Sequence, residues 1–484
     1  MPICPSCGKT FSGFSFGSNP ATECADCRKA KTQAQAAGVA AGSTVAHSPA
    51  RPAIPYAAPP AIRYFAPPPV TLAIMAANVL VYLAMGISGA SWTDPNILDA
   101  VKWGADFGPL TLSSDWWRLF TSTFVHFGII HIALNMWCLW NLGSTLEPFM
   151  GRKVFGVMYV ASGLAASLTS VAWNQWRVSA GASGAIFGVA GALVTYFALK
   201  KTTMDSVLVK RNLRSLGIFI FYNLLYGVSG RVDNSAHIGG LVAGLILGAA
   251  IPPMLRASAG PQYIPVGPPG LGREADESRA NRVAFTVAAV SAIVLIFGFA
   301  TLRAKKTAVA RYGSAVKLIK AGKPDQAVAQ LQESVKFDPD VYYSQGMLGE
   351  LLLQQQNPSA AVEPLERVAS MYPNAYDAQH NLALAYLGAG RADTALPLIF
   401  KSFSAQKDDT WRSQFVRGIA EAEVADYPLA SADLRAVIKA NPDLAEAKQL
   451  LAQVPDSGTP ATKPQIAIPY DKLVMKSEYW PLYP

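Results

Sequence analysis

Two side chains at the starts of apolar runs have the chemistry of a nucleophile and its general base. Ser183 lies in a Gly-Ala-Ser-Gly sequence that opens the run 182–199, and His237 lies at the start of the run 236–255. An ionisable side chain within a membrane span is costly and marks a functional site by default. A serine beside a histidine can be activated for attack on a carbonyl carbon. The pair therefore predicts hydrolysis inside a membrane.

Two potential hydrogen-bond donors lie near the start of a third apolar run, 127–146. His131 and Asn135 are four residues apart, so they share one face of a helix. A neutral imidazole offers one N–H and a carboxamide offers two. Such donors beside a serine can hold the anionic oxygen of a tetrahedral intermediate. We therefore expect His131 and Asn135 to form an oxyanion hole for Ser183.

Each of these groups also has a purely structural interpretation. The glycines that follow Ser183 and those that follow His237 are typical of small-residue seams between packed membrane helices. His131 and Asn135 could form an interhelical hydrogen-bond pair. The coincidence of all four groups at matching ends of three separate runs favours the catalytic interpretation.

The elements that position these residues are apolar segments of membrane-spanning length. Only 15% of the 484 residues are charged, against about 25% in a typical soluble domain, so we expect a membrane protein with soluble appendages. Each segment is close to the about 20 residues that a spanning helix needs. The segments are 70–88, 127–146, 154–173, 182–199, 215–229, 236–255 and 283–302. The fifth is the shortest.

The net charge of +9 predicts an anionic partner. Because the basic residues are spread through loops, we expect this partner to be lipid headgroups and not nucleic acid. Basic residues favour the cytoplasmic side, and the loop after the fourth segment carries Lys200, Lys201, Lys210, Arg211 and Arg214. Counting back predicts a cytoplasmic N-terminus and an outer position for the catalytic ends. Counting forward through the seventh segment predicts that the C-terminal region lies outside.

The basic residues around the seventh segment give conflicting evidence on the side of the membrane where the C-terminal region lies. Arg303, Lys305, Lys306 and Arg311 follow the segment, which argues for a cytoplasmic end there. The alternative is that the fifth or the seventh segment does not cross, which would return the C-terminal region to the cytoplasm.

Four of the five cysteines form two Cys-x-x-Cys pairs near the N-terminus. Cys4 with Cys7 and Cys24 with Cys27 have the spacing of a tetrahedral zinc site. Four thiolates leave no open position, so the zinc is expected to be structural, and no cofactor is expected for catalysis. Two disulfides are the alternative, in an oxidising compartment. Cys138, in an apolar run, is interpreted as a small buried hydrophobic residue.

The C-terminal region contains a helical repeat. Small residues recur in two series with a step of about 34 residues, which is the length of a tetratricopeptide unit. The series are Ala315, Gly349, Ala383 and Gly418, and Ala327, Ala361, Ala395 and Ala430. This region resembles tetratricopeptide repeats, and four units would form a curved solenoid with a peptide-binding face. No function is predicted for the tail.

The region 70–255 resembles the rhomboid family of intramembrane serine proteases. The motifs that carry the resemblance are Trp117-Arg118, His126, His131-x-x-x-Asn135, Glu147, Gly-x-Ser-Gly at 181–184 and Ala-His-x-x-Gly at 236–240. The resemblance implies a six-helix core, a Ser183–His237 dyad without an aspartate, and an oxyanion hole from His131, Asn135 and the Ser183 backbone N–H. It implies scaffold roles for Trp117, Arg118 and Glu147. Phe187 replaces a tyrosine that some members stack on the histidine.

These observations predict an all-α polytopic membrane protein. Its expected parts are a zinc-ribbon-like segment (1–30), a Pro/Ala-rich linker (31–69), a six-helix protease domain (70–256), a linker (257–282), a seventh transmembrane helix (283–302), tetratricopeptide-like repeats (308–450) and a tail (451–484).

The expected function is an endopeptidase that cleaves transmembrane segments of other proteins, most simply in a bacterial inner membrane. The alternative is a catalytically silent scaffold that recruits partners through the zinc ribbon and the repeats. In either case, the repeats are expected to bind protein or peptide partners.

Overall fold

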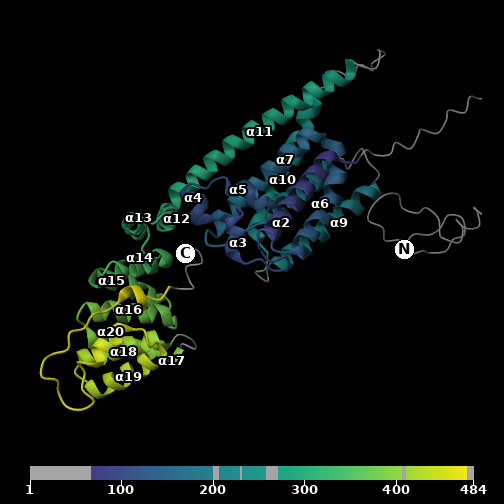
Figure 1. The fold of residues 1–484 in the computed structure, drawn as a ribbon. Helices are drawn as coiled ribbons and strands as arrows, with labels where there is room; N and C mark the ends of the chain where they lie inside the picture. The colour runs from purple at the N-terminus through teal and green to yellow at the C-terminus, as the bar shows by residue number, and fades with distance from the viewer. Residues whose placement is uncertain (1–66, 200–205, 229–231, 258–270, 406–409, 477–484) are drawn as a thin grey trace, which may run out of the picture. The chain divides into compact units, whose positions relative to one another are not determined.

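The structure is a computed structural model, and it describes residues 67–199, 206–228, 232–257, 271–405 and 410–476. The four N-terminal cysteines and most of the 31–69 linker lie outside these residues. The described chain is almost entirely helical, as the sequence predicts (Figure 1). Its two strands, β1 (Asp106–Phe107) and β2 (Val178–Ser179), form one short antiparallel pair in which Asp106 faces Ser179.

Each of the seven apolar segments lies on a helix. The helices are α2 (Pro69–Ile87), α6 (Ile129–Met150), α7 (Arg152–Trp173), α8 (Ser183–Leu199), α9 (Ser206–Gly227), α10 (Asn234–Ala257) and α11 (Leu271–Lys305). Between α2 and α6 lie α3 (Ile97–Lys102), α4 (Gly108–Ser113), α5 (Arg118–Thr121) and the 3₁₀ helix η1 (Ser122–Phe124). We refer to residues 88–128 as loop 1.

Four helices in the described chain are long and apolar enough to cross a membrane on their own: α2, α7, α10 and α11. A fifth candidate is α6 joined to α5 and η1, although the two parts meet at a bend of 94°. Helix α8 is apolar but spans only 17 residues. Helix α9 does not qualify, because Lys210, Arg211 and Arg214 lie in its first half. The fifth segment is therefore the least certain membrane crossing.

Helix α11 has the surface of a lipid-facing helix. One side packs on the core, where Val283, Ala284 and Val287 are buried. Large apolar side chains such as Phe285, Ile293 and Phe297 are more than two-thirds exposed. An apolar surface of this kind on a soluble domain would be an aggregation hazard, so a membrane is its natural environment.

Successive core helices run in alternating directions, which gathers the candidate catalytic residues at one end of the bundle. The N-terminus of α2 meets the C-terminal part of α6, because the Glu147 carboxylate accepts hydrogen bonds from the Val70 and Thr71 N–H groups at 3.0 and 2.8 Å. The opposite end holds the starts of α6, α8 and α10. We call it the Ser183 end.

The C-terminal region folds as helical hairpins, confirming the tetratricopeptide-like repeats. The four hairpins are α12 (Thr307–Lys320) with α13 (Pro324–Phe337), α14 (Tyr342–Gln354) with α15 (Pro358–Met371), α16 (Tyr376–Gly388) with α17 (Ala392–Ala405), and α18 (Thr410–Glu423) with α19 (Tyr427–Ala440). The alanines of the second series, Ala327, Ala361, Ala395 and Ala430, are all fully buried. These small side chains let the two helices of each hairpin pack closely.

Two short helices follow the hairpins. Helix α20 (Ala445–Leu451) packs on α19, and α21 (Tyr470–Leu473) lies in the tail. Tyr470 and Leu473 are buried in the same hydrophobic core as the repeats.

Candidate active site

Ser183 and His237 lie in direct hydrogen-bond contact. Ser183 is the first residue of α8 and His237 lies in the first turn of α10. Their Oγ and Nε2 atoms are 2.9 Å apart. A separation of this size lets the imidazole accept the serine proton, so the two residues have the geometry of a nucleophile and a base.

The rest of the His237 ring lies in an apolar setting. Phe187, one turn along α8 from Ser183, stacks on the ring with centroids 4.2 Å apart and planes 8° apart. The buried Nδ1 makes no hydrogen bond to any described side chain or backbone group. Among the described residues, therefore, no carboxylate orients His237 through a hydrogen bond to Nδ1. Stacking and helix packing hold the ring in place.

His131 and Asn135 lie beside the backbone that leads into Ser183. A Cβ atom added to Gly181 would stand 2.8 Å from Cε1 of His131 and 3.9 Å from Nδ2 of Asn135. Gly181 also has φ +123°, a conformation that L side chains rarely adopt. Glycine is therefore required here on both counts, and its absent side chain leaves room for the two donors.

The hydrogen bonds of His131 fix which nitrogen carries the proton. Its Nδ1 accepts from the Phe127 N–H at 3.2 Å, so in the neutral ring the proton is on Nε2, the atom nearer Gly181. Asn135 donates one amide hydrogen to the His131 carbonyl at 3.0 Å, which leaves the other free to bind elsewhere. Each residue thus retains a donor that can serve an anionic oxygen.

His126 connects loop 1 to the residue before the serine. It is fully buried, its Nδ1 lies 3.1 Å from the Phe124 carbonyl, and its Nε2 accepts from the Ala182 N–H at 3.5 Å. These contacts correspond to a neutral ring with the proton on Nδ1. His126 positions the approach to Ser183, and it does not touch His237 in the hydrogen-bond network.

Helices α8 and α10 approach each other so closely that their facing glycines admit no side chain. A Cβ on Gly240 would overlap the Gly184 carbonyl oxygen, and one on Gly244 would overlap the Gly188 carbonyl oxygen. The small-residue seam that the sequence offered as an alternative is therefore real. It is compatible with the catalytic interpretation, because the same seam brings Ser183 and His237 together.

Asp233 is a functional candidate that the sequence analysis did not identify. It precedes α10, and its carboxylate accepts from the N–H groups of Ser235 and Ala236, each at 3.1 Å. It also accepts from the Ser170 hydroxyl of α7 at 2.5 Å. Burial raises the pKa of Asp233, but the hydrogen bonds from Ser170, Ser179, Ser235 and Ala236 outweigh it and hold the pKa below its usual value. An aspartate just before an apolar run is a helix N-cap signal, and it was present in the sequence.

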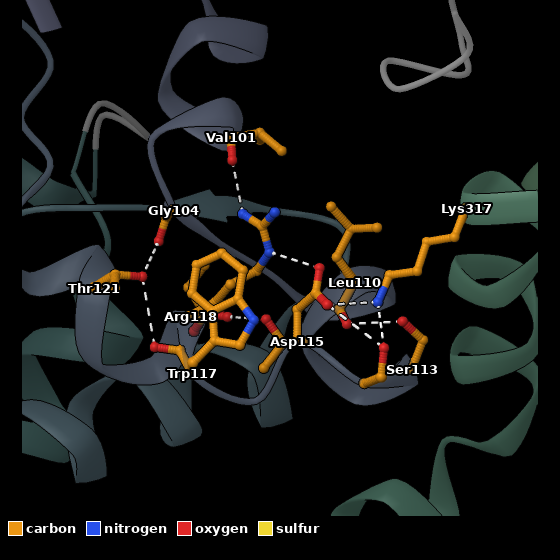
Figure 2. Close-up of polar contacts among 12 residues, drawn as sticks. Val101, Gly104, Leu110, Ser113, Asp115, Trp117, Arg118, Thr121 and Lys317 are labelled. Carbon is orange, nitrogen blue, oxygen red and sulfur yellow. Dashed lines mark hydrogen bonds and ion pairs between the residues drawn. The ribbon is translucent and has the colours of Figure 1, made fainter. Parts of the chain in front are cut away.

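Loop 1 is held by Arg118, as expected for a scaffold residue. The guanidinium donates to the carbonyls of Val101 and Ala105 at 2.7 and 3.1 Å, and its Nε lies 3.3 Å from Asp115 (Figure 2). Trp117 stacks against it, with the guanidinium carbon 4.6 Å from the ring centroid. Both residues thus make these contacts within loop 1 and not with Ser183 or His237, which is consistent with the scaffold roles that the resemblance implies.

The first repeat hairpin packs on loop 1. Lys317 of α12 reaches Asp115 at 2.6 Å, so Asp115 is shared between Arg118 and the repeats (Figure 2). Gly313 lies against the Pro109 carbonyl of α4. Lys306 donates to the Gln175 side chain at 3.2 Å. The repeats therefore adjoin the Ser183 end of the bundle.

Comparison with known proteins finds two matching family models. Residues 113–253 match the rhomboid domain model, and residues 312–369 and 347–408 match a tetratricopeptide repeat model. Rhomboid protease AarA of Providencia stuartii is 31% identical over 213 residues, which is 39% of this chain and 75% of that protein. The chain belongs to the rhomboid family.

Other relatives match a smaller share of their own length. Rhomboid protease GluP of Bacillus subtilis is 37% identical over 37% of this chain and 34% of that protein. RHOMBOID-like protein 5 of Arabidopsis thaliana is 38% identical over 36% of this chain and 56% of that protein. The chain thus spans a third to about half of the length of these two relatives.

Proposed function

We propose that this protein is an intramembrane serine endopeptidase that cleaves transmembrane segments of other membrane proteins with a Ser183–His237 dyad. The observation that carries the proposal is the 2.9 Å contact between Ser183 Oγ and His237 Nε2 beside the donors of His131 and Asn135. The names of the relatives support the protease class.

The proposed reaction begins with attack of Ser183 Oγ on the carbonyl carbon of the scissile peptide bond, while His237 Nε2 takes the hydroxyl proton. The tetrahedral intermediate then expels the amine, to which His237 returns the proton, leaving an acyl ester on Ser183. Water attacks the ester by the same route, releasing the new carboxylate and restoring the serine hydroxyl.

Three donors would stabilise the anionic oxygen of both intermediates. They are the Nε2–H of His131, the second amide hydrogen of Asn135 and the backbone N–H of Ser183. The last is available because the first four N–H groups of an α-helix have no partner within the helix. Donors held in place before the reaction need no reorganisation as charge develops, which is the main source of their effect.

The substrate class follows from the surroundings of the dyad. Ser183 and His237 begin two apolar helices at the Ser183 end, among core helices with exposed apolar faces. A segment that reaches them through lipid must itself be apolar. We therefore propose transmembrane helices, cut near the end that faces loop 1, as substrates.

The test compares Ser183→Ala, His237→Ala and the double variant in cleavage of a membrane reporter. In a serine protease, loss of a catalytic serine or histidine lowers kcat by about 10⁶. Each single variant should therefore be inactive, and the double variant should be no worse. Near-wild-type turnover by a folded Ser183→Ala chain would refute the dyad, and an inactive wild type would favour a silent scaffold.

We further propose a cytoplasmic N-terminus, with Cys4, Cys7, Cys24 and Cys27 holding one structural zinc ion. All four lie outside the described residues, so the support is their spacing alone. Metal analysis of the full chain should find one zinc per chain, and the matched Cys4→Ser, Cys24→Ser variant should lose it with protease activity retained. A full chain without zinc would contradict this site.

We also propose that the repeats lie outside the cytoplasm, on the same side as the Ser183 end. The contacts of α12 with loop 1 support the shared side, and the basic loop after α8 supports its assignment. A fusion at Pro484 tests this: alkaline phosphatase should be active there, and green fluorescence without phosphatase activity would contradict the external position.

A further inference from the structure

The tail of the chain crosses the first helices of successive repeats and is bound there through both its backbone and its buried apolar side chains. Leu473 is fully buried, and Tyr470 and Met475 are each only 8% exposed. Helix α21 contacts α14, α16 and α18, and Met475, which follows it, contacts α16. We call the surface of α14, α16 and α18 beneath residues 466–476 the tail groove.

Asn381 of α16 binds both backbone groups, the N–H and the carbonyl, of one tail residue. Its Nδ2 donates to the Met475 carbonyl at 2.8 Å, and its Oδ1 accepts from the Met475 N–H at 2.9 Å. A carboxamide paired in this way satisfies one backbone donor and one backbone acceptor, much as a neighbouring β-strand would. Because the Asn381 carboxamide binds the backbone and not the side chain at this position, the contact accepts many residue types.

Two more groove residues also bind tail carbonyls. His380 of α16 is fully buried, and its Nε2 donates to the Leu473 carbonyl at 2.9 Å while its Nδ1 contacts the Ser413 hydroxyl at 3.1 Å. Arg412 of α18 donates to the Lys472 carbonyl at 2.8 Å. Side chains of the repeats thus bind the backbone carbonyls of residues 472, 473 and 475 and the N–H of residue 475.

This pattern differs from that of a permanent core. Burying asparagine and histidine is costly unless each polar atom is paired, and an apolar contact would stabilise a fixed element at lower cost. Polar side chains aimed at the backbone of a short segment, with apolar anchors between them, are instead what recognition of a peptide requires, here one helical turn (Tyr470–Leu473) followed by the non-helical residues 474–476. The connection is accessible to cleavage, because residues 456–459 and 461–463 are exposed, although Asp456 pairs with Arg435 and Lys463 with Glu423.

We propose that the tail groove is a peptide-binding site that the chain occupies with its own tail, and that it binds in trans a peptide of the same chemistry. That ligand has an apolar aromatic anchor, leucine three residues later and an apolar residue two further on, as in Tyr470, Leu473 and Met475. The tethered tail competes with it at an effective concentration of about millimolar, so an external peptide binds well only when the tail is displaced. The proposal does not depend on proteolysis.

The test uses the full chain in detergent with a cleavable sequence for a site-specific protease inserted between the exposed residues Gly458 and Thr459. After cleavage and washing, a fluorescent peptide of residues 466–476 should bind saturably, and at least tenfold more tightly than to the uncleaved chain. The peptide with Leu473→Asp should not bind. The peptide with Asp471→Asn is the matched control, because Asp471 is exposed, and it should bind unchanged.

A second variant separates recognition from folding. Asn381→Leu keeps a side chain of similar size but removes both hydrogen bonds to the Met475 position, and it should weaken peptide binding by about tenfold or more. The proposal is overturned if the cleaved tail does not exchange with the peptide, if the cleaved and uncleaved chains bind equally, or if release of the tail abolishes the circular dichroism signal of the repeats. The last result would make the tail a structural element and not a ligand.

Discussion

The α8–α10 pair and the repeat hairpins both bring helices close together with small residues, but their buried polar groups are treated differently. Between α8 and α10, glycines face carbonyl oxygens, and the nearby His237 Nδ1 is buried without a hydrogen bond in the described chain. In the repeats, buried His380 and Asn381 are both paired, with partners that include the tail. In the proposed function, the Ser183 end keeps hydrogen-bond donors available for a reaction, whereas the tail groove is already filled by residues of the same chain.

The first prediction concerns the hydrogen-bond donors beside Ser183, which include the Asn135 amide. Asn135→Ala should lower kcat for reporter cleavage by about 100- to 1,000-fold, which is the usual cost of removing one oxyanion donor. The effect should fall on kcat, because the donor acts on a charge that exists only in the intermediates. Steady-state kinetics in detergent measure both constants, and a change confined to KM would contradict the role.

The second prediction compares the two kinds of helix packing. Gly240→Ala should destabilise the core by about 1–3 kcal/mol, since its methyl group would overlap the Gly184 carbonyl. Gly418→Ala is the matched control in the repeats, where the nearest atom to a new Cβ is 3.4 Å away. It should be neutral or stabilise by up to about 1 kcal/mol, because alanine favours a helix over glycine.

Thermal unfolding in detergent checks this pair, with retained cleavage activity reporting on the core and circular dichroism on all helices. Equal tolerance of both substitutions would show that α8 and α10 are less tightly packed than the structure has them.

How far the sequence could predict these two regions depends on the range of the contacts. The core helices and the buried alanines of the repeats follow from local periodicity, so they were accessible. The pairing of Ser183 with His237 is a long-range contact, and it was accessible only because both residues begin apolar runs and lie in motifs that resemble the rhomboid family. Helix α9 begins at Ser206 and not near 215, because its charged first turns continue the helix without being apolar. The tail groove was not accessible: Asn381 and Met475 are far apart in sequence, and neither belongs to a motif.

The third prediction concerns how binding of the tail in the tail groove depends on pH. The pKa of His380 is lowered to about 4, mainly by burial and to a smaller extent by the nearby Arg412, against the hydrogen bond to the Leu473 carbonyl, which raises it. Release of the tail exposes the ring, whose pKa then returns toward its usual value near 6.5. The docked state therefore binds fewer protons, so docking is strongest above about pH 6.5 and weakens as the pH falls toward 4.

Affinity of the cleaved chain for the 466–476 peptide should fall by about tenfold or more between pH 7 and pH 5. His380→Gln keeps a donor for the Leu473 carbonyl and does not titrate, so its affinity should change far less over this range. An identical pH profile for both chains would exclude His380 as the responsible group.

The smallest expected effect lies where the two regions meet. Lys317→Met removes the ion pair with Asp115, whose partners are partly exposed, so the loss of stability should be at most about 1 kcal/mol. Lys336→Met is the control, because the Lys336 side chain is 78% exposed and its ammonium is 4.0 Å from Glu333, and it should have no measurable effect. Hydrogen exchange in loop 1 should rise in Lys317→Met alone, and unchanged exchange would mean that the repeats do not hold the loop.

The central claim is that Ser183 is a nucleophile activated by His237. Fluorophosphonate labelling of the full chain in membranes, followed by peptide mass spectrometry, tests it most directly. The account predicts a covalent adduct on Ser183 in the wild type, a much slower adduct in His237→Ala and none in Ser183→Ala. Equal labelling of the wild type and Ser183→Ala, or an adduct on a different residue, would contradict it.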